Sequence, residues 1–389
     1  MPKTILRAVA FALCFVISTA TFAYCSEPSL PALALEESLK SPSAILMDAG
    51  TGTVLLTKNE HERRPIASVT KVMTMLLVIE AVDSGKIGWD DKVRASSHAA
   101  SYGGSQIWLE EGEILTVEEL FLATSVESAN DCAVALGEFI AGSEEAFVAI
   151  MNQRAQQLGM QNTKFTNACG LDIDDPYSSA YDVALMSREL IQHEKIFDFS
   201  TIRLTYLQRA KLKSELTSPN AQLLRTYTGY DGLKTGMTDK AKWCLASTAK
   251  RGQLRLVAIV LGASTSVERK GDIVRLLDYG FANFEGRRIA AEGQEIGTTK
   301  LSKGITREVK AVAKEDLDIL TPKGTQSTLE QRTDWLILTA PLSAGQKVGT
   351  LSVLRDGNEI GYVDLLAAED VKRAPIWLHF TRLWERLLR

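Results

Sequence analysis

The chain is poor in the residues that build metal and redox sites. Among 389 residues there are only five cysteines and four histidines. No two cysteines form a C-x-x-C pair, and the histidines lack the H-E-x-x-H spacing of a zinc peptidase. The sequence therefore predicts no metal site, no redox motif and no cofactor.

The chain also lacks a basic excess and a long apolar run. Its formal net charge is −4 and it has no basic stripe, which argues against nucleic-acid binding. The apolar stretch near the N-terminus, residues 8–17, is short for a membrane span. It follows Lys3 and Arg7 and precedes small residues up to Ala23. This order predicts a signal peptide over residues 1–23, with a retained membrane anchor as the alternative.

Export would place the mature chain where disulfides form. The four cysteines beyond the leader cannot be paired from the sequence, and buried free thiols are the preferred interpretation over a disulfide. They are Cys25, Cys132, Cys169 and Cys244.

Three short motifs stand in an informative order. They are S-x-x-K at Ser68–Lys71, S-x-N at Ser128–Asn130 and K-T-G at Lys234–Gly236. Each alone is weak, because a second S-x-x-K occurs at 247–250 and a second S-x-N at 218–220. Together they are typical of serine enzymes acylated by D-Ala-D-Ala peptides and β-lactams.

The first motif begins an apolar segment. Apolar residues at helical spacing over 69–79 predict a buried helix with Ser68 in its first turn. The i+3 spacing places the Lys71 amine on the same side as Ser68. A lysine acts as a base only when neutral, so we expect burial or a nearby cation, for which Lys234 is the candidate, to lower its pKa.

Other patterns predict mixed helix and strand. Two apolar runs, 44–47 and 53–56, flank a glycine-containing turn and predict a β-hairpin. Residues 115–136 are helical in pattern, with the second motif in the middle or at a break, and 254–261 resembles a buried strand. We expect the three motifs to converge in a cleft between helices and a sheet.

The composition changes towards the C-terminus. Residues 24–285 are interpreted as the catalytic domain, and short apolar runs between turns predict a small β-rich domain over 286–370. Residues 371–389 place apolar side chains on one helical face with arginines beside it, which predicts an amphipathic helix on a membrane surface. A helix packed on its own β domain is the alternative.

The chain resembles the low-molecular-weight penicillin-binding proteins, which are serine-type D-alanyl-D-alanine carboxypeptidases of the penicillin-binding protein 5 type. The resemblance rests on residues 67–71, 128–131, 231–236 and 279–281. It implies an α+β fold: a serine β-lactamase/transpeptidase-like catalytic domain, a small all-β C-terminal domain and a terminal amphipathic helix. Two departures are Met237, where the family often has histidine, and Lys242–Trp243 in place of a Gly–aromatic step.

The resemblance also implies roles for single residues. Ser68 would be the acylated nucleophile, Lys71 its general base and Ser128 a proton relay to the leaving amine. Asn130 would hold the peptide amide.

The substrate carboxylate would meet positive charge on the third motif. Lys234 and Thr235 would bind it, and Gly236 belongs to the same substrate-binding segment. Arg269 would be a second cation, with a surface charge as the alternative. The N–H groups of Ser68 and Met237 would form the oxyanion hole.

The predicted function is removal of the terminal D-Ala from peptidoglycan pentapeptides through a Ser68 acyl-enzyme, with β-lactams as covalent inhibitors. The expected location is the periplasm, on the outer face of the inner membrane, attached to the membrane surface through the C-terminal helix. Alternatives are a D,D-endopeptidase, a catalytically silent cell-wall scaffold, or a β-lactamase. The last is disfavoured because no E-x-x-L-N segment lies between Asn130 and Lys234.

Overall fold

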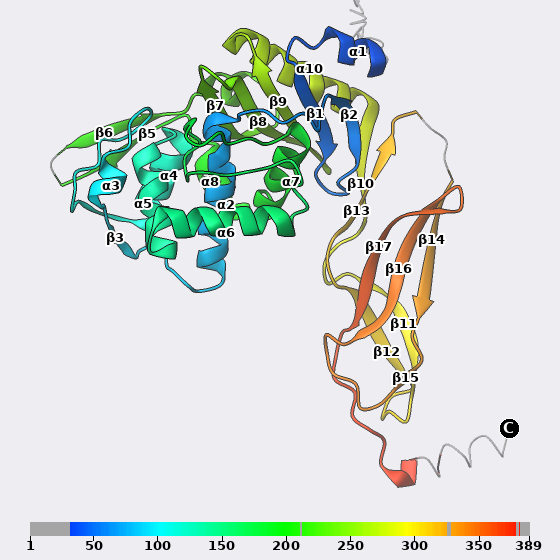
Figure 1. The fold of residues 1–389 in the computed structure, drawn as a ribbon. Coiled ribbons are helices and arrows are strands. Elements are labelled where there is room, and N and C mark those ends of the chain that lie inside the picture. Colours follow the sequence, from blue (N-terminus) through cyan, green and yellow to red (C-terminus); the bar gives the residue numbers. More distant parts are fainter. Residues whose placement is uncertain (1–31, 211, 325–327, 379–380, 382–389) are drawn as a thin grey trace, which may run out of the picture.

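The computed structural model describes residues 32–210, 212–324, 328–378 and 381. An N-terminal domain of helices around a sheet is followed by an elongated β domain (Figure 1). The predicted α+β class is confirmed. The predicted signal peptide and Cys25 lie outside the described residues. The other three mature cysteines, Cys132, Cys169 and Cys244, are free and buried, as predicted.

A five-stranded antiparallel sheet with the order β2-β1-β9-β8-β7 supports the N-terminal domain. The predicted hairpin and the predicted buried strand, which is β9, are both confirmed. Strand β7 lies at one edge of the sheet, where it contacts the turn that carries Ser68. The strands are β1 (Ser43–Asp48), β2 (Val54–Lys58), β7 (Tyr230–Thr238), β8 (Lys242–Arg251) and β9 (Leu254–Ala263).

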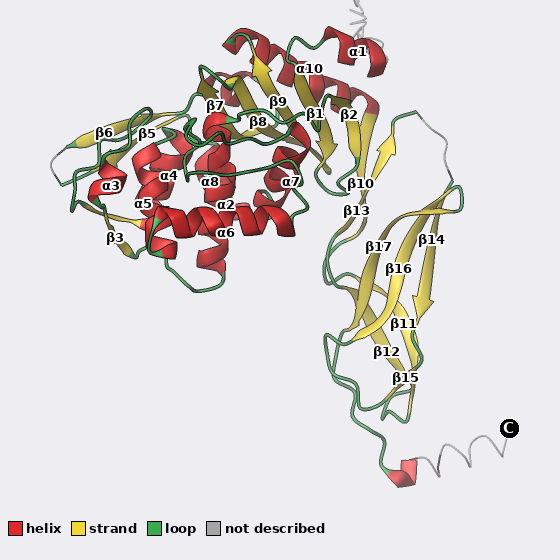
Figure 2. Ribbon diagram, viewed as in Figure 1, coloured by secondary structure: helices red, strands yellow, loops and turns green. Residues whose placement is uncertain are grey.

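Both faces of this sheet are covered, as Figure 2 shows. Alternating residues of one strand therefore belong to different cores. Leu46 and Leu256 pack in a core that includes helices α1 (Ala32–Ser38) and α10 (Ser266–Asn283), whereas Ile45 and Val257 belong to the larger core on the opposite face. This explains why β1 and β9 are apolar on both faces.

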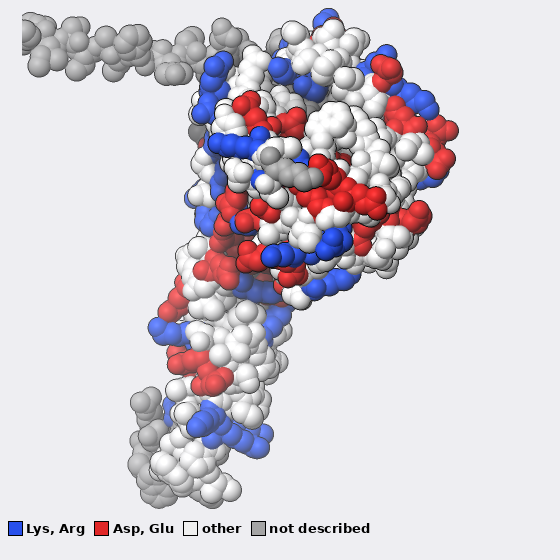
Figure 3. Space-filling model, turned by 90° about the vertical axis from the view of Figure 1, so that its left-hand side faces the viewer, with Lys and Arg blue, Asp and Glu red and all other residues white. Residues whose placement is uncertain are grey.

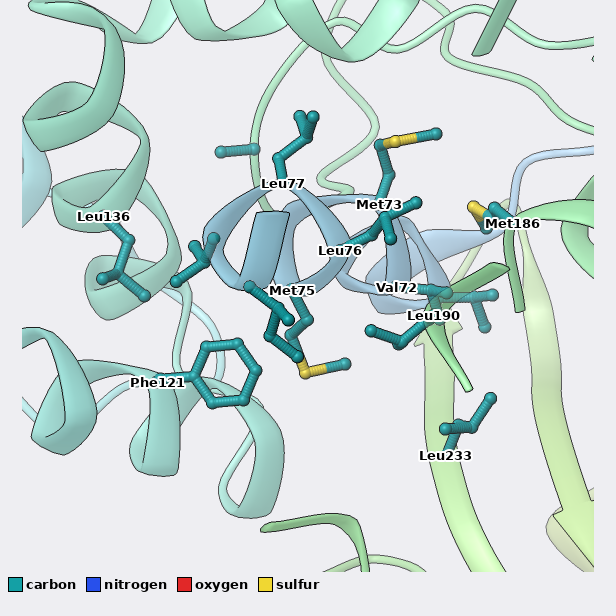
Figure 4. Close-up of a cluster of buried hydrophobic side chains, with 14 of the residues drawn as sticks. Val72, Met73, Met75, Leu76, Leu77, Phe121, Leu136, Met186, Leu190 and Leu233 are labelled. Carbon is teal, nitrogen blue, oxygen red and sulfur yellow. The ribbon is translucent and has the colours of Figure 1, made fainter. Parts of the chain in front are cut away.

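Helix α2 (Lys71–Asp83) is the centre of the larger core. Ten of its 13 residues are buried, so neighbours surround it on all sides. Figure 4 shows Phe121, Leu136, Met186 and Leu233 from four other elements around it. A helix packed in this way holds the turn at its N-terminus in a fixed position.

Shorter elements complete the domain. The helices and turns are η1 (Ala67–Thr70), α3 (Ser97–Ala100), α4 (Val117–Val126), α5 (Asn130–Ala141), α6 (Glu144–Gln157), α7 (Ala180–Leu190), η2 (Glu194–Ile196), α8 (Phe197–Ser200) and α9 (Ala221–Thr226). The short strands form two hairpins, β3 (Lys92–Arg94) with β4 (Ile114–Thr116) and β5 (Leu204–Gln208) with β6 (Lys213–Thr217).

The β domain has its own apolar core. Strands β10 and β13 pair with each other, and a six-stranded sheet has the order β14-β16-β17-β12-β11-β15. The predicted boundary at 285/286 falls inside β10, because α10 passes directly into this strand without a linker. The strands are β10 (Phe284–Ala290), β11 (Glu295–Ser302), β12 (Glu308–Ala313), β13 (Leu317–Pro322), β14 (Leu329–Trp335), β15 (Leu338–Thr339), β16 (Lys347–Arg355) and β17 (Asn358–Ala367).

The β domain extends slightly further than the sequence indicates. Val371 pairs with Leu342 and Arg373 with Gly304, so the predicted helix cannot begin at 371. Residues 376–378 are helical, and most of the predicted terminal helix lies outside the described residues. None of the described helices combines the length and the apolar character needed to cross a membrane.

Candidate active site

Ser68 lies in the 3-10 turn η1, directly before α2. The preceding residue, Ala67, has a left-handed backbone with φ of 48°. Two glycines approach this turn closely. A Cβ on Gly170 would lie 1.9 Å from the Ala67 carbonyl oxygen, and one on Gly236 would lie 2.5 Å from that of Ile66. The turn that carries Ser68 is therefore fixed by backbone contacts that only glycine permits.

Lys71 is fully buried and donates to three neutral oxygens. Its Nζ lies 2.9 Å from Ser68 Oγ, 2.6 Å from Asn130 Oδ1 and 2.9 Å from the Cys169 carbonyl oxygen. Burial lowers the pKa of Lys71 to about 8. The expected base is thus within reach of the serine, and desolvation, rather than repulsion from Lys234, is the main cause of its shift.

The second motif lies at a break between two helices. The predicted helix 115–136 is split into α4 and α5, and Ser128 stands between them with φ of 68°. Asn130 begins α5, and its Nδ2 donates to the Gly103 carbonyl at 2.6 Å while its Oδ1 accepts from Lys71. In this structure the Asn130 carboxamide positions the lysine.

The third motif is on the edge strand β7. Lys234 is buried, and its Nζ donates to the Thr235 carbonyl at 3.1 Å. Burial, followed by repulsion from Lys71 and Arg269, lowers the pKa of Lys234 well below its usual value. Gly236 contacts the turn that carries Ser68, and the Met237 side chain is about half exposed.

Arg269, on α10, is buried rather than a surface charge. Its Nη1 donates to the Cys244 carbonyl at 3.3 Å, and its guanidinium lies 5.2 Å from the centre of the Trp243 ring. Its Nε has no hydrogen-bond partner within the described part of the chain. Because burying an uncompensated cation is costly, Arg269 and Lys234 together form a site suited to an anion.

The loop 167–171 also shapes the site, although no pattern in the sequence predicted it. The Asn167 Oδ1 accepts the N–H groups of Cys169, Gly170 and Leu171 at 3.2, 2.6 and 3.1 Å. This one side chain turns the loop so that the Cys169 carbonyl reaches Lys71. The only sequence signal was a glycine that adopts a positive φ, and a glycine alone predicts no site.

Glu144, a buried carboxylate at the start of α6, was not predicted from the sequence either. Its Oε1 accepts from Ala168 N at 2.9 Å, and its Oε2 accepts from the Tyr102 hydroxyl and lies 2.7 Å from His98 Nε2. The hydrogen bond to Glu144 raises the pKa of His98. Tyr102 precedes Gly103. Glu144 therefore joins the two segments whose carbonyls hold Lys71 and its partner Asn130.

A buried lysine beside a serine, next to an anion site, is typical of serine enzymes that are acylated by a carboxylate-bearing substrate. The chain belongs to the D-alanyl-D-alanine carboxypeptidase family. Residues 31–265 match the model of that family, and residues 284–373 match the C-terminal domain of penicillin-binding protein 5.

Several known proteins are similar to this chain over most of its length. It is 42% identical over 340 residues to D-alanyl-D-alanine carboxypeptidase DacF of Bacillus subtilis, which covers 86% of this chain and 87% of the relative. The structure of penicillin-binding protein 5 from Haemophilus influenzae matches with a TM-score of 0.70 and 32% identity, over 86% of this chain and 98% of that chain. Ampicillin-bound penicillin-binding protein D2 of Listeria monocytogenes matches with a TM-score of 0.57 and 34% identity, over 63% and 98%.

These matches confirm the predicted family, fold and activity. The protein is a serine hydrolase of the cell wall, a D-alanyl-D-alanine carboxypeptidase. The alternative hypotheses of a silent scaffold and of a β-lactamase are therefore rejected.

Glu144→Ala should lower the rate of serine acylation about tenfold or more, because the loops that hold Lys71 lose their common anchor, and small displacements of catalytic groups are costly. Glu144→Gln should recover part of this rate, since the amide oxygen can still accept from Ala168. The measurement is the acylation rate by a fluorescent penicillin, together with the melting temperature.

Glu138→Ala is the matched control. Glu138 accepts a hydrogen bond from Ser96 in the same region, at 2.6 Å, but has no recorded bond to the 167–171 loop. It should lose stability without losing rate. If both variants lose rate in proportion to stability, Glu144 has no positioning role.

Proposed function

We propose that Ser68 is the nucleophile and Lys71 its general base in the removal of the terminal D-Ala from peptidoglycan pentapeptides. Neutral Lys71 takes the Ser68 proton while Oγ attacks the carbonyl carbon of the penultimate D-Ala. As the peptide bond breaks, a proton passes through Ser128 to the leaving amine of the last D-Ala. A water then hydrolyses the ester and restores Ser68. The 2.9 Å contact between a serine and a lysine with a pKa near 8 carries this proposal.

We propose further that the substrate carboxylate binds Lys234, the Thr235 hydroxyl and Arg269. An anion there compensates the two buried cations and restores the charged form of Lys234. Gly236 brings β7 against the nucleophile turn, which favours the N–H groups of Ser68 and Met237 as the oxyanion hole. Loss of one such donor costs about 3 kcal/mol in the transition state.

β-Lactams fit the same site because they carry a carboxylate next to a reactive amide. The Listeria relative is described in an ampicillin-bound form. We propose that such compounds acylate Ser68 of this chain.

Ser68→Ala should abolish both D-Ala release and covalent penicillin labelling while the protein stays folded. Ser247→Ala is the control from the second S-x-x-K: Ser247 is buried in β8, where its hydroxyl lies 3.1 Å from that of Tyr230. It should be labelled like the wild type. Labelling of Ser68→Ala at the wild-type level, detected by intact mass, would disprove the assignment.

The acylation rate at saturating substrate should depend on the Lys71 proton. A base must be neutral, so with a pKa of about 8 the rate should rise about tenfold per pH unit below 8 and level off above it. At saturating substrate the substrate carboxylate stays beside Lys234. Titration of Lys234 therefore does not contribute to the pH dependence of the acylation rate. Single-turnover measurements from pH 5 to 9 test this, and a rate that falls between pH 6 and 8 would exclude a lysine base.

We also propose export through the signal peptide over residues 1–23 and attachment of the terminal segment to the outer face of the inner membrane. Ile376 and Trp377 are exposed where the chain leaves the β domain. Exposed Lys303, Lys372 and Arg373 lie on the paired segments beside them. Figure 3 shows Lys and Arg side chains near the largely uncharged lower end of this domain. Apolar and cationic groups together favour an anionic lipid surface.

Removal of the tail should release the protein from membranes. A chain ending at Pro375 keeps the buried Val371 and its pairing with Leu342. It should stay in the supernatant with vesicles containing anionic lipid, with unchanged turnover of small peptides, whereas the full mature chain should sediment. If both distribute alike, the tail packs on protein and the membrane proposal fails, while the catalytic assignment stands.

A further inference from the structure

Trp108 is displayed to solvent in an unfavourable conformation. Its side chain is 73% exposed, and its φ is 63°, in the left-handed region that bulky residues avoid. Its neighbours Ile107 and Leu109 are buried. Single exposed apolar side chains are common and need no explanation. An exposed apolar side chain on a strained backbone is different, because the strain must be held by the surrounding structure, and it points to a function.

Two buried charged side chains hold this backbone. The Asp131 carboxylate accepts from Ile107 N at 3.2 Å and from Leu109 N at 3.0 Å. The Arg209 guanidinium donates to the carbonyl oxygens of Ile107 and Trp108, the latter at 3.0 Å, and pairs with Glu113. These contacts fix the backbone on both sides of residue 108. The indole is therefore held in place before any ligand binds, and binding does not have to order the loop.

The frame is connected to the active site. Asp131 follows Asn130, whose N–H donates to the Ser105 carbonyl at 2.7 Å. Trp108 is three residues beyond Ser105, so the two lie at most about 10 Å apart along the chain. In a pentapeptide, four residues lie between the scissile bond and the glycan strand, and they extend over about 13 Å. A stem running from Ser68 past Asn130 is therefore long enough for its sugar-bearing end to reach Trp108.

We propose that Trp108 is a stacking platform for a hexosamine ring of the glycan strand, and hence a second substrate contact that lies outside the peptide cleft. A pyranose ring offers a flat face of C–H groups, and an indole is a wide, rigid and aromatic surface that loses little conformational entropy on contact. The proposal rests on the proposed function, because the substrate direction follows from acylation at Ser68.

The test compares one pentapeptide in two forms, free and linked to its disaccharide. Trp108→Ala should raise KM about tenfold for the disaccharide-linked form, with kcat unchanged, and leave the free peptide unaffected. Trp108→Phe should keep most of the preference, since an aromatic face remains. Val267→Ala is the matched control, because Val267 is 80% exposed on α10 and outside this frame.

Trp108→Gly separates the strain from the ring. Glycine accepts the left-handed backbone, so the melting temperature should rise by a few degrees while the disaccharide preference is lost. Equal losses on both substrates would show that Trp108 shapes the peptide cleft, and no change on either would show that the ring contacts no substrate. Each result overturns the glycan proposal. A wild-type enzyme that releases D-Ala from neither form would instead contradict the proposed function.

Discussion

The desolvated amine of Lys71 is the constraint on which the site depends. A carboxylate partner would raise the pKa of this lysine and remove the base at neutral pH. The structure surrounds the amine with neutral oxygens instead, from Ser68, Asn130 and Cys169. Asp131, which follows Asn130 in the sequence, uses its carboxylate on backbone N–H groups of Ile107 and Leu109. The same arrangement that keeps Lys71 deprotonable also fixes the loop that displays Trp108.

Rigid packing supports this balance. Helix α2 is enclosed on nearly all sides, and Gly170 and Gly236 bring two further segments into backbone contact with the turn at its N-terminus. A side chain at either glycine would push the loop or the strand away from Ser68. The distance between Ser68 and Lys71 is thus determined by the core and by close backbone contacts, and little freedom remains in the apo site.

The parts predicted from the sequence were those encoded locally. The hairpin, the strand β9 and the position of Ser68 at the start of a helix follow from periodicity and turn residues. Asn167, Glu144 and the Cys169 carbonyl were missed because their roles arise from contacts across the chain; Lys71 and Cys169 are 98 residues apart. The burial of Arg269 and the cause of the Lys71 shift depend in the same way on tertiary packing, which a single sequence does not display.

Lys242 and Trp243, which replace the family's Gly–aromatic step at the start of β8, show how the anion site keeps the charge of Arg269. Lys242 adopts a φ of 55°, a conformation for which the Gly of the family's Gly–aromatic step is better suited. The following Trp243 lies under the Arg269 guanidinium. An aromatic ring and the Cys244 carbonyl thus hold Arg269 without a carboxylate that would neutralise it. Lys71 and Arg269 are both held by neutral partners in a dry environment, and burial lowers the pKa of both. The ordinary pKa of arginine is higher than that of lysine, so Lys71 can lose its proton while Arg269 stays charged and available to an incoming carboxylate.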